Sequence, residues 1–158
     1  MRTFFLLLII LITTGSGYGQ LNFSGKWKLN VAKSQFNNTP ITTAATKIFV
    51  DQKKTTITLQ RDDFPRENLR TDGSETEIVS GNAVATKIKV SMKLTPDKTG
   101  LTEIRNFIYP EGIKGTLETR KTRKWSLSAD KKTLTIQEHL ETNHKSLSFH
   151  MVLVYEKV

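Results

Sequence analysis

The side chains with the most chemical potential are three histidines near the C-terminus, His139, His144 and His150. With a turn at His144, an antiparallel hairpin would make His139 and His150 diagonal neighbours on one face of a sheet. Together with a neighbouring glutamate they would form part of a metal site, but tight zinc binding needs three or four converging ligands. Because polar residues share their face, the pattern indicates exposed histidines and neither a metal nor another cofactor.

Other groups of catalytic residue types are equally incomplete. Ser148 and His150 are two positions apart on one strand, which places them side by side at roughly 7 Å rather than in hydrogen-bond contact. No Gly-x-Ser-x-Gly motif is present. The carboxylate pairs 62–63 and 75–77 lie in polar, turn-like stretches, which favours solvated surface over glycosidase chemistry. The sequence therefore predicts a protein that is not an enzyme and has no catalytic residues.

The charge of the chain is strongly positive, with 24 Lys and Arg against 15 Asp and Glu and a net charge of +9. Such a balance favours anionic partners such as a membrane surface or a polysaccharide. The basic residues alternate along predicted strands, so most of them are expected on a solvated outer face, with Lys87, Lys89 and Lys93 as the clearest group. Nucleic acid is not an expected partner, because the most basic stretch, 114–124, lacks interleaved aromatic residues.

The first 19 residues have the features of a secretory signal peptide. Arg2 precedes an unbroken apolar run over residues 4–12, and small residues occupy Gly17 and Gly19. Nine apolar residues are far fewer than the roughly 20 that span a bilayer, so cleavage before Gln20 is expected. The chain contains no cysteine, which excludes a lipid-modified lipoprotein. We therefore expect a secreted or periplasmic protein whose single domain covers residues 20–158 and is a monomer.

Beyond residue 20, the sequence consists of short segments in which apolar and polar residues alternate, as in half-buried strands. The cleanest is 85–94, where Ile88, Val90 and Met92 alternate with lysines. Loop 31–44 is long, and a helical turn is expected within 31–36. A short hairpin is expected across Asp72-Gly73, a strong turn pair. Strands are predicted at 24–30, 46–51, 55–61, 67–71, 75–79, 85–94, 101–109, 114–120, 124–128, 133–140 and 147–155.

No stretch beyond residue 20 has a sustained helical period, and turn signals recur between the strands. This pattern predicts an all-β protein: an antiparallel up-and-down meander of roughly eight to ten strands. So many strands would leave exposed edges unless the sheet closes on itself. A closed barrel is therefore the predicted architecture.

Both ends of this region resemble a known family. The segment 23–30, Phe-Ser-Gly-Lys-Trp-Lys-Leu-Asn, is followed by Lys33-Ser34 and Phe36, and it resembles the start of small secreted bacterial lipocalin-like proteins. Segments 125–136 and 154–157 resemble their C-terminal hairpin. The resemblance implies a calycin-type barrel whose lumen can hold one small apolar ligand. It also implies that Gly25 and Trp27 close one end of the barrel, with Arg120 or Arg123 packed on the indole.

The inward apolar residues are the candidates for contact with such a ligand. The same residues can instead fill the lumen completely, because a barrel of eight strands is just wide enough for either arrangement. A solid barrel would favour the alternative function of an envelope-associated interaction protein that uses its basic outer face. The candidate lumen residues are Ile48, Val50, Ile57, Leu59, Ile88, Val90, Met92, Ile136, Phe149 and Met151.

Overall fold

The computed structural model describes residues 21–158 with the exception of 38, 40–43, 79–86, 110–117 and 144–147. The predicted signal peptide, residues 1–19, lies outside these described residues, as does His144. The described chain forms ten β-strands and one short 3₁₀-helix, η1, Val31–Lys33. No helix in the described part is both long enough and apolar enough to cross a membrane. The strands are β1 Gly25–Leu29, β2 Lys47–Gln52, β3 Thr56–Arg61, β4 Glu67–Arg70, β5 Asp72–Ile78, β6 Lys87–Leu94, β7 Gly100–Ile108, β8 Glu118–Leu127, β9 Thr133–Thr142 and β10 Phe149–Lys157.

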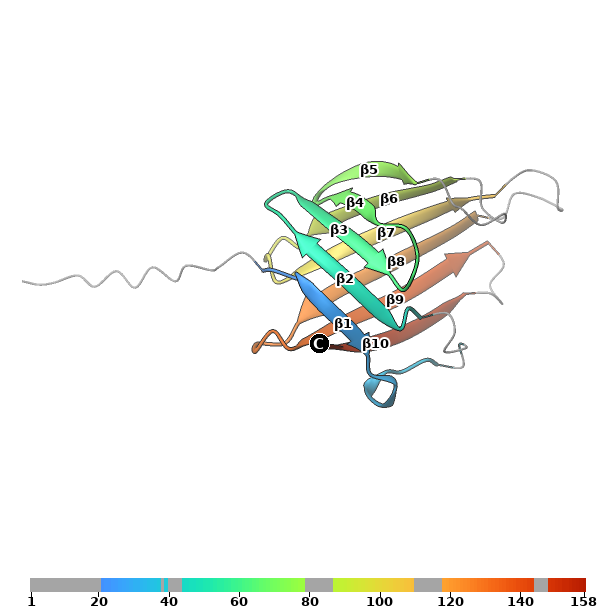
Figure 1. Cartoon of the computed structure of the whole chain (residues 1–158). Helices are drawn as coiled ribbons and strands as arrows, with labels where there is room; N and C mark the ends of the chain where they lie inside the picture. The colour runs from blue at the N-terminus through green and yellow to red at the C-terminus, as the bar shows by residue number, and fades with distance from the viewer. Residues whose placement is uncertain (1–20, 38, 40–43, 79–86, 110–117, 144–147) are drawn as a thin grey trace, which may run out of the picture.

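All ten strands belong to one antiparallel sheet that curls into a nearly closed barrel, as predicted (Figure 1). Strands that follow one another in the sequence pair, with the exception of β4 and β5. In addition, β1 pairs with β10, where Trp27 lies opposite Lys157. The sheet therefore ends at β4 and β5, which share no ladder. Hereafter the tryptophan end is the end of the barrel where β1 begins, and the far end is where β1 finishes.

The predicted hairpin across Asp72-Gly73 is wrong. A single residue, Thr71, joins β4 to β5, and β4 pairs with β3 while β5 pairs with β6. Asp72-Gly73 instead forms an irregularity inside β5: the register against β6 shifts between Asp72 and Glu75, and Gly73 has φ +89°. The turn-forming residues therefore lie at a bulge within β5, and β4 and β5 form the two edges of the sheet.

A second correction concerns β8. The sequence predicted two strands, 114–120 and 124–128, whereas one continuous strand runs through Glu118–Leu127. Residues 114–117 lie outside the described part. Lys121 and Arg123 fell between the two predicted strands, but both side chains are largely buried inside the barrel, with 15% and 12% of their surface exposed. Partners on neighbouring strands make this burial possible.

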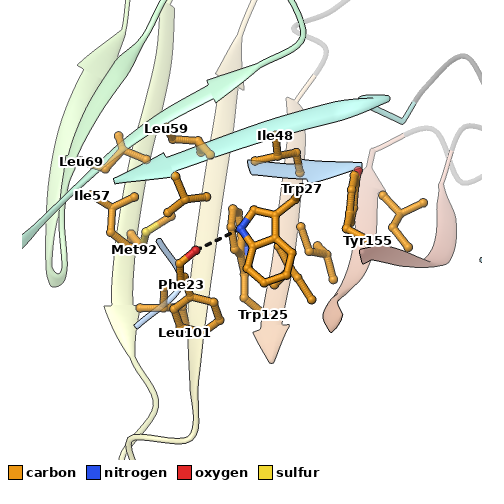
Figure 2. Packing of buried hydrophobic residues seen from close by; sticks show 14 of the residues in the cluster. Phe23, Trp27, Ile48, Ile57, Leu59, Leu69, Met92, Leu101, Trp125 and Tyr155 are labelled. Carbon is orange, nitrogen blue, oxygen red and sulfur yellow. Dashed lines mark hydrogen bonds between the residues drawn. The ribbon is translucent and has the colours of Figure 1, made fainter. Parts of the chain in front are cut away.

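The apolar core fills the tryptophan end (Figure 2). Trp27 and Trp125 are each 1% exposed, and the ring of Phe23 meets the ring of Trp125 edge-on at 6.2 Å between centroids. The indole Nε1 of Trp27 donates a 3.0 Å hydrogen bond to the carbonyl oxygen of Phe23. This bond satisfies the polar atom of a side chain that is otherwise packed among apolar neighbours. Leu101 and Leu134, each fully buried, complete the floor of the barrel.

Gly100 permits the close approach of β7 to β8 at this end. A methyl group at Gly100 would lie 2.6 Å from the main-chain oxygen of Trp125. We expect Gly100→Ala to lower the free energy of unfolding by about 1–3 kcal/mol, because the backbone must shift. Urea unfolding measures it, with the exposed Lys124→Ala as a control expected within about 0.5 kcal/mol of the native protein. Equal midpoints for the two variants would contradict this account.

Candidate functional site

The predicted lumen residues do point into the barrel, but most of them are packed solid. Eight of the ten are between 0% and 3% exposed and belong to one core cluster. Ile88 and Phe149 differ, because they are only partly buried against that cluster. The eight core residues are Ile48, Val50, Ile57, Leu59, Val90, Met92, Ile136 and Met151.

A cavity among the described interior residues is correspondingly small. It has a volume of about 10 Å³ and is lined by residues that include Arg61, Glu138 and Tyr155. Such a volume corresponds to about one water molecule. The described core residues of the tryptophan half are closely packed.

A network of charged side chains occupies the middle of the lumen, and it is centred on Glu103, which is fully buried. Its Oε1 accepts hydrogen bonds from Arg61 at 2.8 Å, from Arg105 at 2.5 Å and from Arg123 at 3.1 Å. Its Oε2 accepts from Arg61 at 2.9 Å and from the indole Nε1 of Trp125 at 3.1 Å. One carboxylate from β7 thus joins guanidinium groups from β3, β7 and β8.

Two further carboxylates complete the network. Glu67 on β4 accepts hydrogen bonds from Arg61 and from both terminal nitrogens of Arg105. Glu138 on β9 accepts from Arg123 through Oε2. Its Oε1 lies 3.0 Å from Lys121 Nζ, an ion pair without the geometry of a hydrogen bond. These seven side chains are the buried ion network: Arg61, Glu67, Glu103, Arg105, Lys121, Arg123 and Glu138.

The network holds its carboxylates in the ionised form. Burial by itself would raise the pKa of Glu103, but the three guanidinium groups around it outweigh that effect and hold the pKa well below its usual range. The same balance of burial against neighbouring cations lowers the pKa of Glu67 and of Glu138. Burial and repulsion by Arg105 and Arg123 lower the pKa of Arg61 to about 10, so it remains charged at neutral pH.

These shifts predict a loss of stability in acid. A carboxylate with a lowered folded-state pKa stabilises the fold above its unfolded-state pKa of about 4.3, and that contribution disappears as the pH falls towards the folded-state value. We therefore expect the thermal unfolding midpoint to fall steadily below about pH 5. Circular dichroism melts between pH 7 and pH 3 measure this, and Glu103→Gln should give a shallower decline. A midpoint that stayed level down to pH 3 would contradict the role of the network.

The far end of the lumen has a different character. Lys121 Nζ lies 6.0 Å from the ring centroid of Phe107 and 5.9 Å from that of Phe149, so the ammonium group is flanked by two phenyl rings. The apolar inner-face side chains of the long strands remain partly exposed here, in contrast to the closed packing at the tryptophan end. These side chains are Ile78, Ile88, Phe107, Leu140 and Phe149.

The residues predicted to close the barrel have separate positions. Trp27 is buried at the tryptophan end, but the cation over its ring is Lys157, 5.5 Å from the centroid, in place of the predicted Arg120 or Arg123. Lys157 reaches this position because it pairs directly opposite Trp27. Arg123 points into the buried ion network, whereas Arg120 is exposed on the outer face. Gly25 has φ +152°, and a methyl group there would lie 2.8 Å from Cε of Lys157 and 3.6 Å from Cε2 of Trp27.

A larger pocket, of about 550 Å³, is a surface groove where β1 ends and β2 begins. None of the ten predicted ligand-contacting residues lines it. Asp62 in its wall is engaged in the fold: Oδ1 accepts hydrogen bonds from the amides of Thr46 and Lys47 and from the hydroxyl of Thr46. The groove is lined by Leu29, Val31, Ala44, Thr46, Lys47, Asp62 and Asp63.

The two described histidines lie on the outer face of the barrel. His139 and His150 are directly opposite each other on β9 and β10, rather than diagonal, and their ring centroids are 6.1 Å apart. His139 Nε2 is 3.3 Å from a carboxylate oxygen of Glu141. Within the described residues, no group of three or more potential ligands could hold a metal ion.

The buried ion network is the feature that sequence reasoning missed, although a signal was present. Continuing the inward alternation from Trp125 back along β8 gives Arg123 and then Lys121, and the alternation from Leu101 gives Glu103 and then Arg105. Charged residues of both signs at inward positions of two adjacent strands indicate a buried cluster in which the charges neutralise one another.

Comparison with known proteins assigns no relative to this barrel. No family model, curated protein or solved structure matches the chain. The functional conclusions below therefore depend on the residues and their geometry.

Proposed function

We propose that this protein is a secreted, lipocalin-like binding protein of bacterial type, which binds a small amphipathic ligand in the far half of its lumen without transforming it. The antiparallel barrel is compatible with a lipocalin-like fold, and the N-terminal sequence supports export. The observation that carries the proposal is the set of partly exposed apolar side chains around Lys121 at the far end. Binding sites are mostly apolar surfaces with a few polar groups that orient the ligand.

The packing favours the far half of the lumen as the ligand site. Residues below the buried ion network fill the tryptophan half and leave about one water volume among the described residues. The ligand would therefore contact Ile88 and Phe149 among the ten sequence candidates, together with Phe107. The remaining eight candidates would support the barrel from below.

Binding of a neutral fluorescent probe, N-phenyl-1-naphthylamine, tests the proposal. We expect saturable fluorescence enhancement, and about tenfold weaker binding for Phe107→Ser and Phe149→Ser, because each change removes apolar contact area. Val31→Ser, at a residue that is 50% exposed in the surface groove, is the matched control and should bind as the native protein does. A folded protein that does not bind the probe, or that loses binding only with Val31→Ser, would refute the site.

Association with an anionic surface is a second candidate, supported by the net charge of +9. The outer face of β6 is a weaker candidate surface than its lysines suggest, since Lys87 lies 3.1 Å from Glu77 and Lys89 lies 3.7 Å from Glu75. Sedimentation with phosphatidylglycerol vesicles at low and high salt tests this function. Salt-sensitive co-sedimentation would support it, and no sedimentation at low salt would exclude it.

A further inference from the structure

We propose that the ligand's polar end is a single negative charge, and that Lys121 on β8 binds it; this inference rests on the proposed function. The class of ligand is an apolar body bearing one anionic group, such as a carboxylate or a sulfonate.

The first support is a charge count inside the barrel. The buried ion network contains four cations but only three carboxylates. Buried charges are stable only when they are paired. The described interior thus carries one uncompensated positive charge, and an anion would neutralise it.

The distribution of partners assigns that extra charge to Lys121. Each of the three arginines contacts two carboxylates: Arg61 and Arg105 contact Glu67 and Glu103, and Arg123 contacts Glu103 and Glu138. Among the described carboxylates, Lys121 contacts only Glu138, at 3.0 Å, and shares it with Arg123.

The electrostatics of the lysine agree with this assignment. Burial lowers the pKa of Lys121, and repulsion by Arg123 and Arg61 adds to the decrease, despite the attraction of Glu138. The ammonium form is therefore under-stabilised in the free protein. A bound anion would supply the missing attraction, so binding and the charged state of Lys121 would favour each other.

The register also sets the ligand's orientation. Lys121 pairs with Arg105 and Leu140, and Phe107 pairs with Thr119, one inward position nearer the far end. The ammonium group reaches down towards Glu138, while the aromatic rings and Ile88 lie on the side of the far end. The anion would enter first and lie deepest, with the apolar body among the rings.

A matched series of ten-carbon ligands tests the inference: decanoate, decanesulfonate, decan-1-ol and decyltrimethylammonium, measured by isothermal titration calorimetry. A charge-assisted contact predicts that the anions bind about ten- to a hundredfold more tightly than the alcohol, with the cation weakest. A preference for decanoate over decanesulfonate would specify a carboxylate. If all four bind equally, the inference fails and the proposed function stands; if none binds, the proposed function itself fails.

Variants of Lys121 locate the charge. Lys121→Met should bring the affinity for decanoate down to that for decan-1-ol and leave the alcohol unchanged, whereas Lys121→Arg should retain the preference for anions. The outward-facing Lys87→Met is the matched control, 56% exposed, and should bind as the native protein does. Glu138 keeps its contact with Arg123 in Lys121→Met, and far-UV circular dichroism at the assay temperature separates loss of binding from loss of fold. Retained anion preference in Lys121→Met would overturn the assignment.

Discussion

Replacing Glu103 with glutamine is expected to lower the free energy of unfolding by about 3–5 kcal/mol, because it leaves guanidinium groups buried without their shared counter-ion. The side chain is fully buried and bonds to Arg61, Arg105, Arg123 and Trp125. Glutamine has nearly the same shape, so the loss measures charge rather than packing. Such a loss is a large part of the stability of an ordinary domain. Guanidinium chloride unfolding followed by far-UV circular dichroism measures it.

Two further variants show whether the loss arises from the network. Glu77→Gln removes an exposed carboxylate that is 3.1 Å from Lys87, and it should cost at most about 1 kcal/mol. The double variant Arg61→Gln, Glu103→Gln removes one charge of each sign and should be more stable than the sum of the single losses predicts, by about 0.5–3 kcal/mol. Strict additivity, or a loss below 1 kcal/mol for Glu103→Gln alone, would mean that solvent screens these charges.

Trp27→Ala is the second change with a large expected effect, a loss of about 3–5 kcal/mol. The indole is 1% exposed, packs beneath Lys157 and donates to the carbonyl oxygen of Phe23. Alanine would leave a cavity at the floor of the barrel and remove the partner of that carbonyl. Far-UV circular dichroism is again the suitable measurement, because one of the two tryptophans is lost.

A graded comparison separates the two contributions of Trp27. Trp27→Phe retains most of the ring volume and loses the Nε1 donor, so it should cost less than Trp27→Ala but at least about 1 kcal/mol. Val31→Ala, at a half-exposed residue, should change the stability by at most about 0.5 kcal/mol. If Trp27→Ala cost no more than Val31→Ala, the indole would not be the residue that closes this end.

Much of the fold was predictable because the alternation of apolar and polar residues within a short segment indicates a strand. The alternation in 85–94 correctly predicted the strand β6, Lys87–Leu94, and its inward face, with Val90 and Met92 buried. Residues 85 and 86 lie outside the described part. Local turn chemistry was less reliable. Asp72-Gly73 has the composition of a hairpin turn. In the structure, the positive φ of Gly73 instead occurs at a bulge in β5, where the register against β6 shifts.

The candidate site shows a similar division. Phe149 and Ile88 were identified as inward residues from alternation alone, and they lie in the far half of the lumen. Lys121, which lies between Phe107 and Phe149, fell in the gap between two predicted strands and was not among the candidate lumen residues. A lysine in isolation favours solvent, and its position in the lumen depends on Glu138 from the next strand.

The sequence by itself determined that the chain forms short antiparallel strands, with Trp27 among the buried residues, because a period of two requires only neighbouring positions. The tertiary structure alone decided that the middle of the barrel is charged and its tryptophan half solid. Burial of a charge depends on the partner that neutralises it, and Arg61 and Glu103 are 42 residues apart in the chain. Only the curvature and register of the closed sheet bring such residues together.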